Sequence, residues 1–284
     1  MLEEIKAEGA DQLYLDLMKQ CLTRSIFPES YRQIRGRPSR REHPVAWAVY
    51  PMLTPALDKL NLKLFRYAPF DQAKRAEGSD WPAEADTMVG LKRLENLQFC
   101  VTEVIRRNVP GDLIETGVWR GGASIFMRAV LKVYGDRNRV VWLADSFQGL
   151  PKPDERYPQD EGDRHWESSH ILGISLKEVK TNFARYGLLD EQVRFLAGWF
   201  KDTLPTAPIK QLAVLRLDGD MYSSTMDALQ SLYHRVSPGG YVIIDDYGCI
   251  PACKKAVDDF RTEQKITEPM REIDWSGVFW EKSR

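Results

Sequence analysis

The chain has 284 residues, of which 43% are hydrophobic, so it is long and apolar enough to bury one large core. Its 40 Lys and Arg residues nearly balance its 41 Asp and Glu residues, which excludes the strong basic excess typical of a general nucleic-acid-binding protein. No apolar run approaches the roughly 18 residues that a membrane helix needs, and the polar N-terminus MLEEIKAEGADQ is not typical of a secretory signal. We therefore expect a cytoplasmic protein with no nucleic-acid or membrane partner, and its four scattered cysteines complete no zinc set.

Residues 1–85 are predicted to form an N-terminal helical extension or lid. Leu13, Leu17 and Cys21 follow the i, i+4, i+8 spacing of an amphipathic helix over residues 11–24. Residues 45–66 are again apolar with helical character. The basic stretch between them, YRQIRGRPSRREHP, contains the glycine and prolines of a loop. We interpret it as a solvated segment, with a site for a phosphate-bearing partner as the alternative.

Residues 86–284 are predicted to form the main domain, in which strands and helices alternate. A stripe of leucines and valines predicts a long helix from about residue 91, which ends near Pro110-Gly111. Apolar strands are then predicted at 112–115, 139–145, 193–198, 212–218 and 241–245, helices at 123–134, 176–186, about 226–233 and 251–263, and a terminal hairpin from MREID and GVFWEK. Apolar strands without clean alternation, separated by helices, predict a doubly wound, mostly parallel α/β sheet.

The first strand of this pattern ends in ETGVWRGGAS, residues 115–124, and ligands bind at the carboxyl ends of such strands. Its glycines let a ligand approach the backbone, and the start of the following helix offers free N–H groups. A dinucleotide fingerprint would begin with glycine where this chain has Glu115. A carboxylate there would repel a pyrophosphate but suit the amino group of an amino acid. The turn therefore favours S-adenosylmethionine over a nicotinamide cofactor, and a tight turn without a ligand is the alternative.

The next two strand ends carry further candidate cofactor contacts. Asp145 stands where an acidic residue accepts both ribose hydroxyls in dinucleotide folds. A helix cap, a role that Ser146 could share, is the alternative. Gly198 and Trp199 follow the third strand and could bracket an adenine ring, although Trp199 would equally suit the core. Ser175 precedes a helix as a capping residue and could also face the base.

Four aspartates follow the last two parallel strands, in LRLDGD and YVIIDD. Adjacent parallel strands lie about 5 Å apart, so these carboxylates are expected in one small volume, where like charges raise each other's pKa values. A divalent cation resolves that repulsion, and all-oxygen ligands favour Mg²⁺, with Mn²⁺ or Ca²⁺ as alternatives. We predict that Asp218, Asp245 and Asp246 hold the metal and that Asp220 is free to accept a proton. Surface or capping aspartates without a metal are the alternative.

Together these segments resemble the macrocin O-methyltransferase family. The resemblance rests on ETGVWRGGASIFMRAVL, ADSFQGLPKPD, FLAGWFKDTLP, LRLDGDMY and SPGGYVIIDDYG, with DWPAEADTMVGLKRLENLQ upstream. It covers about residues 80–284, plus LYLDLMKQCLTRSIF near the start. Members of this family are metal-dependent enzymes that use S-adenosylmethionine to methylate sugar hydroxyls on antibiotics and related natural products. The segment from about Gly36 to Gly78 is longer than expected for the family, which leaves the acceptor, rather than the chemistry, open.

The resemblance implies a class I methyltransferase fold, Rossmann-like, and a role for each matching residue. It implies that Glu115, Gly117 and Asp145 bind the cofactor, with Thr87 and Met88 near its methionine end. It also implies that Asp218, Asp245 and Asp246 bind Mg²⁺ and that Asp220 is the general base. The neighbouring candidates for cofactor contact are Thr116, Val118, Trp119, Ser146, Ser175, Gly198 and Trp199. The expected acceptor is a small-molecule glycoside, and we expect a homo-oligomer, either a dimer or a higher assembly.

Three alternatives to this interpretation remain. The acceptor could be a catechol-like or other small hydroxylated compound, for which the metal chemistry would be the same. Asp218-Gly219-Asp220 is a D-x-D motif, which metal-dependent glycosyltransferases use to hold Mn²⁺ on a nucleotide sugar, but that function leaves Glu115 and the Asp245-Asp246 pair unexplained. A non-catalytic binding protein could share the fold, although it would have little reason to keep four clustered acids.

Overall fold

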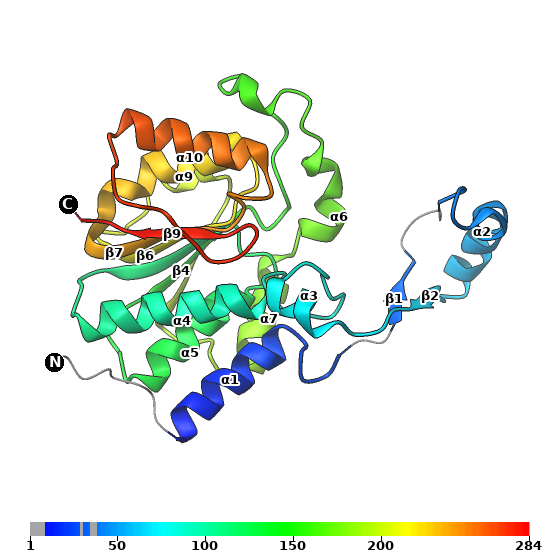
Figure 1. Ribbon diagram of the computed structural model, residues 1–284, viewed down its shortest axis with the longest axis horizontal. Helices are drawn as coiled ribbons and strands as arrows, with labels where there is room; N and C mark the ends of the chain where they lie inside the picture. The colour runs from blue at the N-terminus through cyan, green and yellow to red at the C-terminus, as the bar shows by residue number, and fades with distance from the viewer. Residues whose placement is uncertain (1–8, 29–30, 35–38, 284) are drawn as a thin grey trace.

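A seven-stranded sheet forms the centre of the molecule (Figure 1). The computed structural model describes residues 9–28, 31–34 and 39–283. The strands follow the order β5-β4-β3-β6-β7-β9-β8 across the sheet. Their bounds are β3 Asp112–Thr116, β4 Val141–Asp145, β5 Val193–Ala197, β6 Leu212–Leu217, β7 Val236–Ile244, β8 Arg271–Glu272 and β9 Val278–Glu281. Strands β3 to β7 pair in parallel and β9 pairs antiparallel with β7 and β8, which confirms the predicted sheet and its terminal hairpin.

Helices cover both faces of this sheet (Figure 1). One face carries α4 (Leu91–Arg106), α5 (Gly122–Val133) and α7 (Leu176–Arg185), and the other carries α8 (Phe200–Thr203), α9 (Tyr222–Leu232) and α10 (Pro251–Glu263). Neighbouring residues of a strand point to opposite faces. In β3, Leu113 therefore joins the core under α4 and α5, while Ile114 joins the core under α9 and α10. None of the helices in the described part of the chain is both long and apolar enough to cross a membrane.

The predicted first helix is confirmed as α1 (Ala10–Leu22), which packs against α4 and α5. Its buried apolar residues are Leu15, Met18 and Leu22, which belong to the same core as those helices. The predicted stripe was wrong in part, because Leu13 and Leu17 are exposed. The short helix α3 (Gln72–Glu77) lies beside the start of α4. A buried ion pair anchors α3: Arg75 binds Asp80 at 2.7 Å, and its guanidinium also donates to the carbonyl of Thr23, just past α1. The segment leading into α4 is thereby tied to the main domain.

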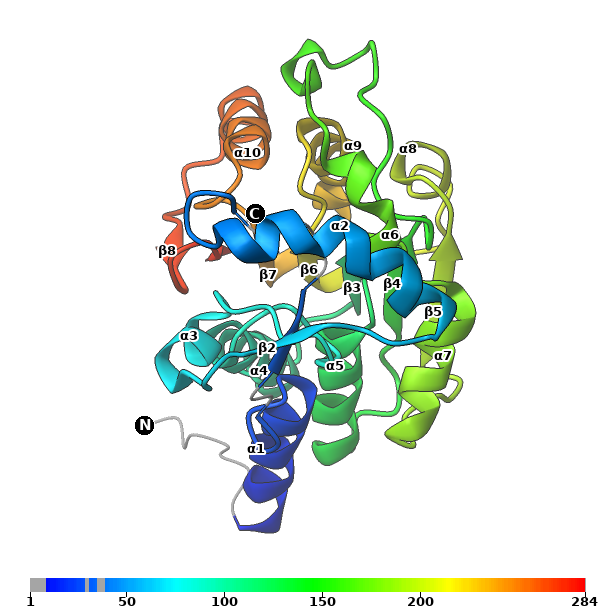
Figure 2. The ribbon, with the colours of Figure 1, turned by 90° about the vertical axis from the view of Figure 1, so that its right-hand side faces the viewer.

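Between α1 and α3 the chain forms an arm that stands away from the main domain (Figure 1). A two-stranded antiparallel ribbon of β1 (Tyr31–Gln33) and β2 (Phe65–Tyr67) carries α2 (Pro44–Lys59) at its end. This ribbon was not predicted from the sequence, in which residues 45–66 suggested only a helix. Figure 2 shows α2 crossing in front of the sheet on the side of the functional site.

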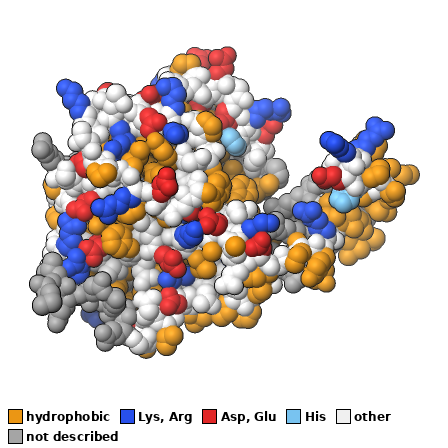
Figure 3. Space-filling model, viewed as in Figure 1, with side chains coloured by type: hydrophobic (Ala, Val, Ile, Leu, Met, Phe, Trp, Pro, Cys, Tyr) orange, Lys and Arg blue, Asp and Glu red, His pale blue; other side chains and the backbone are white. Residues whose placement is uncertain are grey.

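The arm helix α2 has no buried residue in the chain itself. Several of its apolar side chains are exposed, and Figure 3 shows hydrophobic side chains gathered on it. The exposed set includes Val45, Val49, Met52 and Leu53. An apolar helix that buries none of its own residues within the described chain is compatible with the expected homo-oligomer, which stays a prediction.

Two segments differ from expectation or lie outside the description. The last parallel strand was predicted to begin at residue 241, but β7 begins at Val236 and includes Ser237-Pro238-Gly239-Gly240. The register of β7 against β6 shifts there, and Gly239 has a φ of 82°, so the proline and glycines form an irregularity inside the strand. Arg35 and Arg37 of the predicted basic loop lie outside the described residues.

Candidate functional site

The carboxyl ends of β3, β4, β6 and β7 open into one cavity of about 440 Å³. Of the predicted site residues, its wall includes Thr87, Met88, Glu115, Gly117, Val118, Trp119, Asp145, Ser146, Trp199, Asp218, Asp220, Asp245 and Asp246. Thr116, Ser175 and Gly198 are not part of this wall. Thr116 is fully buried, and the Ser175 hydroxyl caps α7 by accepting from the backbone N–H of Glu178 at 3.2 Å. The fold thus brings most of the predicted residues to one place.

The turn after β3 is packed so closely that it needs glycine. Gly117 has a φ of 87°, and a Cβ atom added to it would lie 1.6 Å from the carbonyl oxygen of Asp218. Gly122, the first residue of α5, has the same constraint, because a Cβ there would lie 2.5 Å from the carbonyl oxygen of Asp86. Gly122 therefore lets the start of α5 pack against the loop before α4, which carries Thr87 and Met88, and Gly117 lets the turn pack against the end of β6. The backbone of the turn and this loop therefore border the cavity together.

Glu115 is buried at the base of the cavity with a protein partner on each oxygen. Its Oε1 accepts from Arg216 Nη1 at 2.5 Å, and its Oε2 accepts from the hydroxyl of Ser124. Burial raises the pKa of Glu115 to about 7, against the opposing effect of the Arg216 charge. The sequence predicted that Glu115 contacts the amino group of a cofactor. Such a contact would use the carboxylate lone pairs that the bonds from Arg216 and Ser124 leave free.

Asp145 links β4 to the turn after β3. One of its oxygens accepts from the backbone N–H of Val118 and the other from that of Phe147, both at 2.7 Å. Burial raises the pKa of Asp145 in spite of these hydrogen bonds. The carboxylate of Asp145 therefore sits in a fixed orientation where the sequence predicted a ribose contact. In the turn after β3, Arg120 donates to the carbonyl groups of Ala83 and Ala85.

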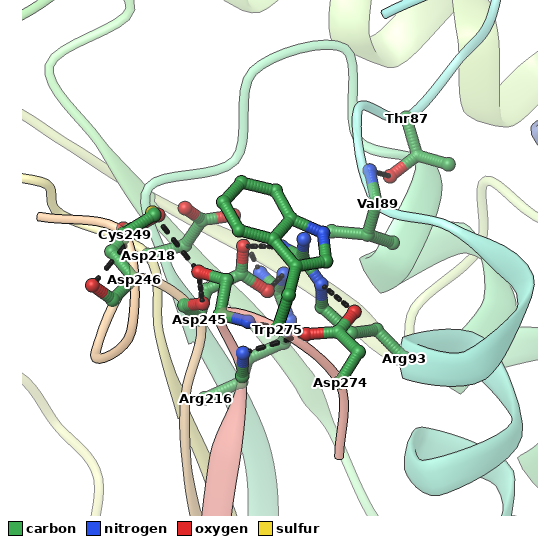
Figure 4. Close-up of polar contacts among 12 residues, drawn as sticks. Thr87, Val89, Arg93, Arg216, Asp218, Asp245, Asp246, Cys249, Asp274 and Trp275 are labelled. Atoms are coloured by element: carbon green, nitrogen blue, oxygen red, sulfur yellow. Dashed lines mark hydrogen bonds and ion pairs between the residues drawn. The ribbon is translucent and has the colours of Figure 1, made fainter. Parts of the chain in front are cut away.

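Asp218, Asp245 and Asp246 meet where β6 and β7 end (Figure 4). Each offers one carboxylate oxygen, and these three atoms lie within 4.8 Å of one another. The Oδ2 atom of Asp246 is buried and has no hydrogen-bond partner in the described part of the chain. A buried carboxylate oxygen without a partner is destabilising, and convergent carboxylates are the ligands that Mg²⁺ and Mn²⁺ prefer. The donor set therefore fits a divalent cation.

Three carboxylates at these strand ends, those of Asp218, Asp220 and Asp246, have raised pKa values. Burial, followed by the charge of Asp245, raises the pKa of Asp218 to about 6. Burial, followed by the charge of Asp218, raises the pKa of Asp220 to about 7. The same causes raise the pKa of Asp246 well above its usual value. The pKa of Asp220, about 7, lies in the range expected of a proton acceptor near neutral pH.

One known protein family matches nearly the whole chain. The family model described as macrocin-O-methyltransferase matches residues 11–282. The chain belongs to this family. It is therefore an S-adenosylmethionine-dependent O-methyltransferase, and the glycosyltransferase interpretation of Asp218-Gly219-Asp220 is rejected.

Curated relatives from the family match nearly the whole chain. The chain is 51% identical over 274 residues to the 8-demethyl-8-(2,3-dimethoxy-alpha-L-rhamnosyl)-tetracenomycin-C 4'-O-methyltransferase of Streptomyces olivaceus, covering 96% of this chain and 94% of the relative. It is 55% identical over 275 residues to the mycinamicin III 3''-O-methyltransferase of Micromonospora griseorubida, covering 96% and 97%. It is 47% identical over 286 residues to the demethyldecarbamoylnovobiocin O-methyltransferase of Streptomyces niveus, covering 100% and 99%.

Solved structures show the same fold. The structure of the O-methyltransferase NovP superimposes with a TM-score of 0.80 at 47% identity, covering 96% of this chain and all of that one. CalS11, a calicheamicin methyltransferase, superimposes with a TM-score of 0.57 at 16% identity, covering 87% of this chain and 94% of that one, and shows a shared fold alone. The class I methyltransferase fold predicted from the sequence is thereby confirmed.

Two arginines that the sequence analysis did not single out complete the site of this family member. Arg216 lies on β6 and is 3% exposed, and Arg93 lies on α4 and is 9% exposed. Arg216 left a signal in the sequence, because a charge inside a fully apolar strand is unstable unless it is paired. Arg93 left no such signal, since charged residues are common on helix surfaces. The sequence analysis also did not single out Trp81 and Trp275, which line the cavity. Trp81 is more than half exposed, and Trp275 is about half exposed.

Proposed function

We propose that the enzyme transfers the methyl group of S-adenosylmethionine to a sugar hydroxyl of a small-molecule glycoside with the help of a divalent cation. The observation that carries this proposal is the carboxylate cluster of Asp218, Asp245 and Asp246, which shares one cavity with Glu115 and Asp145. The names of the relatives support a natural-product glycoside as acceptor, because one of them specifies a rhamnosyl-tetracenomycin, and the others specify mycinamicin III and demethyldecarbamoylnovobiocin.

In this proposal the two walls of the cavity hold different partners. Glu115 and Asp145 bind the amino group and the ribose of the cofactor, and Thr87 and Met88 contact its methionine end. Trp199 and Ser146, which also line the cavity, border the adenine. Asp218, Asp245 and Asp246 hold the cation on the neighbouring strand ends.

Asp220 is proposed as the general base. It lines the cavity two residues beyond Asp218, and its pKa of about 7 suits proton transfer near neutral pH. A bound cation would supply positive charge that makes a nearby hydroxyl more acidic, as bound metals do for water. Asp220 removes the hydroxyl proton, and the acceptor oxygen attacks the sulfonium methyl in line. The methyl–sulfur bond breaks with its electron pair going to sulfur, S-adenosylhomocysteine leaves, and much of the rate comes from orientation. No covalent intermediate with the enzyme is required.

The acceptor class can be tested with labelled cofactor. We expect the purified enzyme and methyl-labelled S-adenosylmethionine to label glycosides that carry a free sugar hydroxyl, in the presence of Mg²⁺. The matching aglycones are the control, and they should remain unlabelled. Label in catechols with none in any glycoside would replace the sugar acceptor by the catechol alternative. Absence of S-adenosylmethionine binding in a calorimeter would overturn the whole proposal.

The raised pKa values predict how the stability of the cation-free protein changes with pH. The pKa values of Asp218 and Asp220 rise from 3.8 to about 6 and about 7 on folding, so the folded state binds protons more tightly than the unfolded state. Their contribution to stability is present below pH about 4 and is lost as the pH rises through 6 and 7. Added Mg²⁺ should therefore raise the Tm more at pH 8 than at pH 5, because its ligands must be deprotonated. Scanning calorimetry with and without Mg²⁺ measures both trends, and an equal rise at both pH values would contradict them.

A further inference from the structure

We propose that Arg93 and Arg216 are positioning residues that clamp the metal ligand Asp245 from two sides. This inference rests on the proposed cation site. Arg93 Nη1 binds Oδ2 of Asp245, and Arg216 Nη2 binds Oδ1. Both oxygens of one carboxylate are therefore held by guanidinium groups, one from α4 and one from β6 (Figure 4). Each oxygen has two lone pairs, so these bonds leave Asp245 able to bind a cation.

Arg216 is itself fixed by acids on three neighbouring strands. Its Nη1 binds Glu115 at 2.5 Å and Asp218 at 2.9 Å, and its Nη2 binds Asp245. Glu115 and Arg216 face each other in the register of β3 against β6. One guanidinium thus connects a proposed cofactor contact to two proposed cation ligands. Glu115, Arg216 and Asp245 are almost closed to solvent, whereas the side chain of Asp218 is 28% exposed.

Arg93 is fixed by a loop from the terminal hairpin. Its Nε donates to Oδ2 of Asp274 at 2.7 Å. The other oxygen of Asp274 accepts from the backbone N–H groups of Ser276 and Gly277, at 2.9 and 2.7 Å, so the carboxylate is held in place. The hydroxyl of Ser276 in turn donates to the backbone carbonyl of Asp245 at 2.7 Å. The loop that carries Asp274 and Ser276 therefore holds Asp245 in two ways. It holds the side chain through Arg93, and it binds the backbone carbonyl directly.

The three proposed ligands are held to different degrees. Asp245 has two arginine partners and Asp218 has one, whereas Oδ2 of Asp246 has no partner in the described residues. Partners that orient a ligand raise metal affinity because the ligand loses less freedom on binding. A guanidinium could instead compete with the cation through its charge, in which case removing it would tighten binding. The geometry favours orientation, because both arginines approach Asp245 in fixed ion pairs with acids outside the ligand set.

The test measures cation affinity directly, by titrating metal-stripped protein with Mn²⁺ and following free Mn²⁺ by electron paramagnetic resonance. Arg93→Met should weaken Mn²⁺ binding by about 10–100-fold, and Arg93→Lys, which keeps the charge, should restore part of it. The affinity for S-adenosylmethionine in calorimetry should change little in Arg93→Met, since Arg93 does not touch Glu115 or Asp145 in the hydrogen bonds described. Arg106→Met is the matched control, because Arg106 lies on the same helix and pairs with Glu103 on the surface.

The outcomes separate the clamp from the proposed function. Equal or tighter Mn²⁺ binding in Arg93→Met, with normal binding in the wild type and in Arg106→Met, overturns the clamp alone. If Arg93→Met does not fold, Asp274→Asn, which loosens the anchor of Arg93, decides by the same titration: weaker Mn²⁺ binding supports the clamp and unchanged binding rejects it. Absence of Mn²⁺ binding in the wild type rejects the proposed cation site, and the clamp with it.

Discussion

Replacing Asp220 by asparagine is expected to lower kcat by about 10²–10⁴-fold, the usual contribution of a general base. The side chain lines the cavity beside the acid cluster, and its raised pKa places it near the operating pH. Asparagine has nearly the same shape but cannot accept the hydroxyl proton. The backbone should tolerate it, because residue 220 has a φ of 59°, and asparagine adopts this left-handed conformation more readily than most residues.

The measurement is a steady-state methylation assay with calorimetric binding of S-adenosylmethionine alongside it. The affinity for the cofactor should stay within a few-fold of the wild type, because Asp220 is not one of the proposed cofactor contacts. Asp202→Asn on α8 is the control, since this exposed aspartate lies outside the cavity wall and should leave kcat unchanged. Full activity of Asp220→Asn would reject the assignment of the base.

Replacing Asp246 by asparagine is expected to abolish cation binding and to lower the rate of methyl transfer by about 10²-fold or more. A catalytic cation supplies several kcal/mol of charge stabilisation, and about 1.4 kcal/mol corresponds to a tenfold change in rate. Asp246 contributes one of the three convergent oxygens, and its Oδ2 has no other partner in the described chain. Removal of cations from the wild type with a chelator should have the same effect on the rate.

The same substitution should stabilise the cation-free protein. Burial raises the pKa of Asp246 well above its usual value, which shows that the ionised form is unfavourable at this position. A neutral amide removes that penalty, so the Tm at pH 8 without cation should rise, by about 2–4 °C for each kcal/mol gained. Stability and activity would thus move in opposite directions, as they often do at functional sites. A variant that retains Mn²⁺-dependent activity would reject Asp246 as a ligand.

Much of the fold and of the acid cluster could be predicted because both depend on local sequence patterns. The alternation of apolar strands and helices after residue 86 determines a doubly wound sheet, and parallel strands bring their carboxyl ends to one edge. LRLDGD and YVIIDD therefore had to place their aspartates together, as the structure confirms. The place of Glu115 and Gly117 on the cavity wall could likewise be predicted, because a few adjacent residues are enough to indicate a glycine-rich turn between a strand and a helix.

Only the tertiary structure decided how the acids are held. Arg93 and Asp245 are 152 positions apart in the chain. They meet because α4 packs against β7, and Asp245 directly follows that strand. Arg216 reaches Glu115 because the register of β6 against β3 sets them opposite each other. The arm with its ribbon was equally unpredictable, since its short strands are determined by pairing rather than by periodicity. Sequence patterns specify which elements form and which residues end them, whereas contacts between distant elements depend on packing and register that no local pattern encodes.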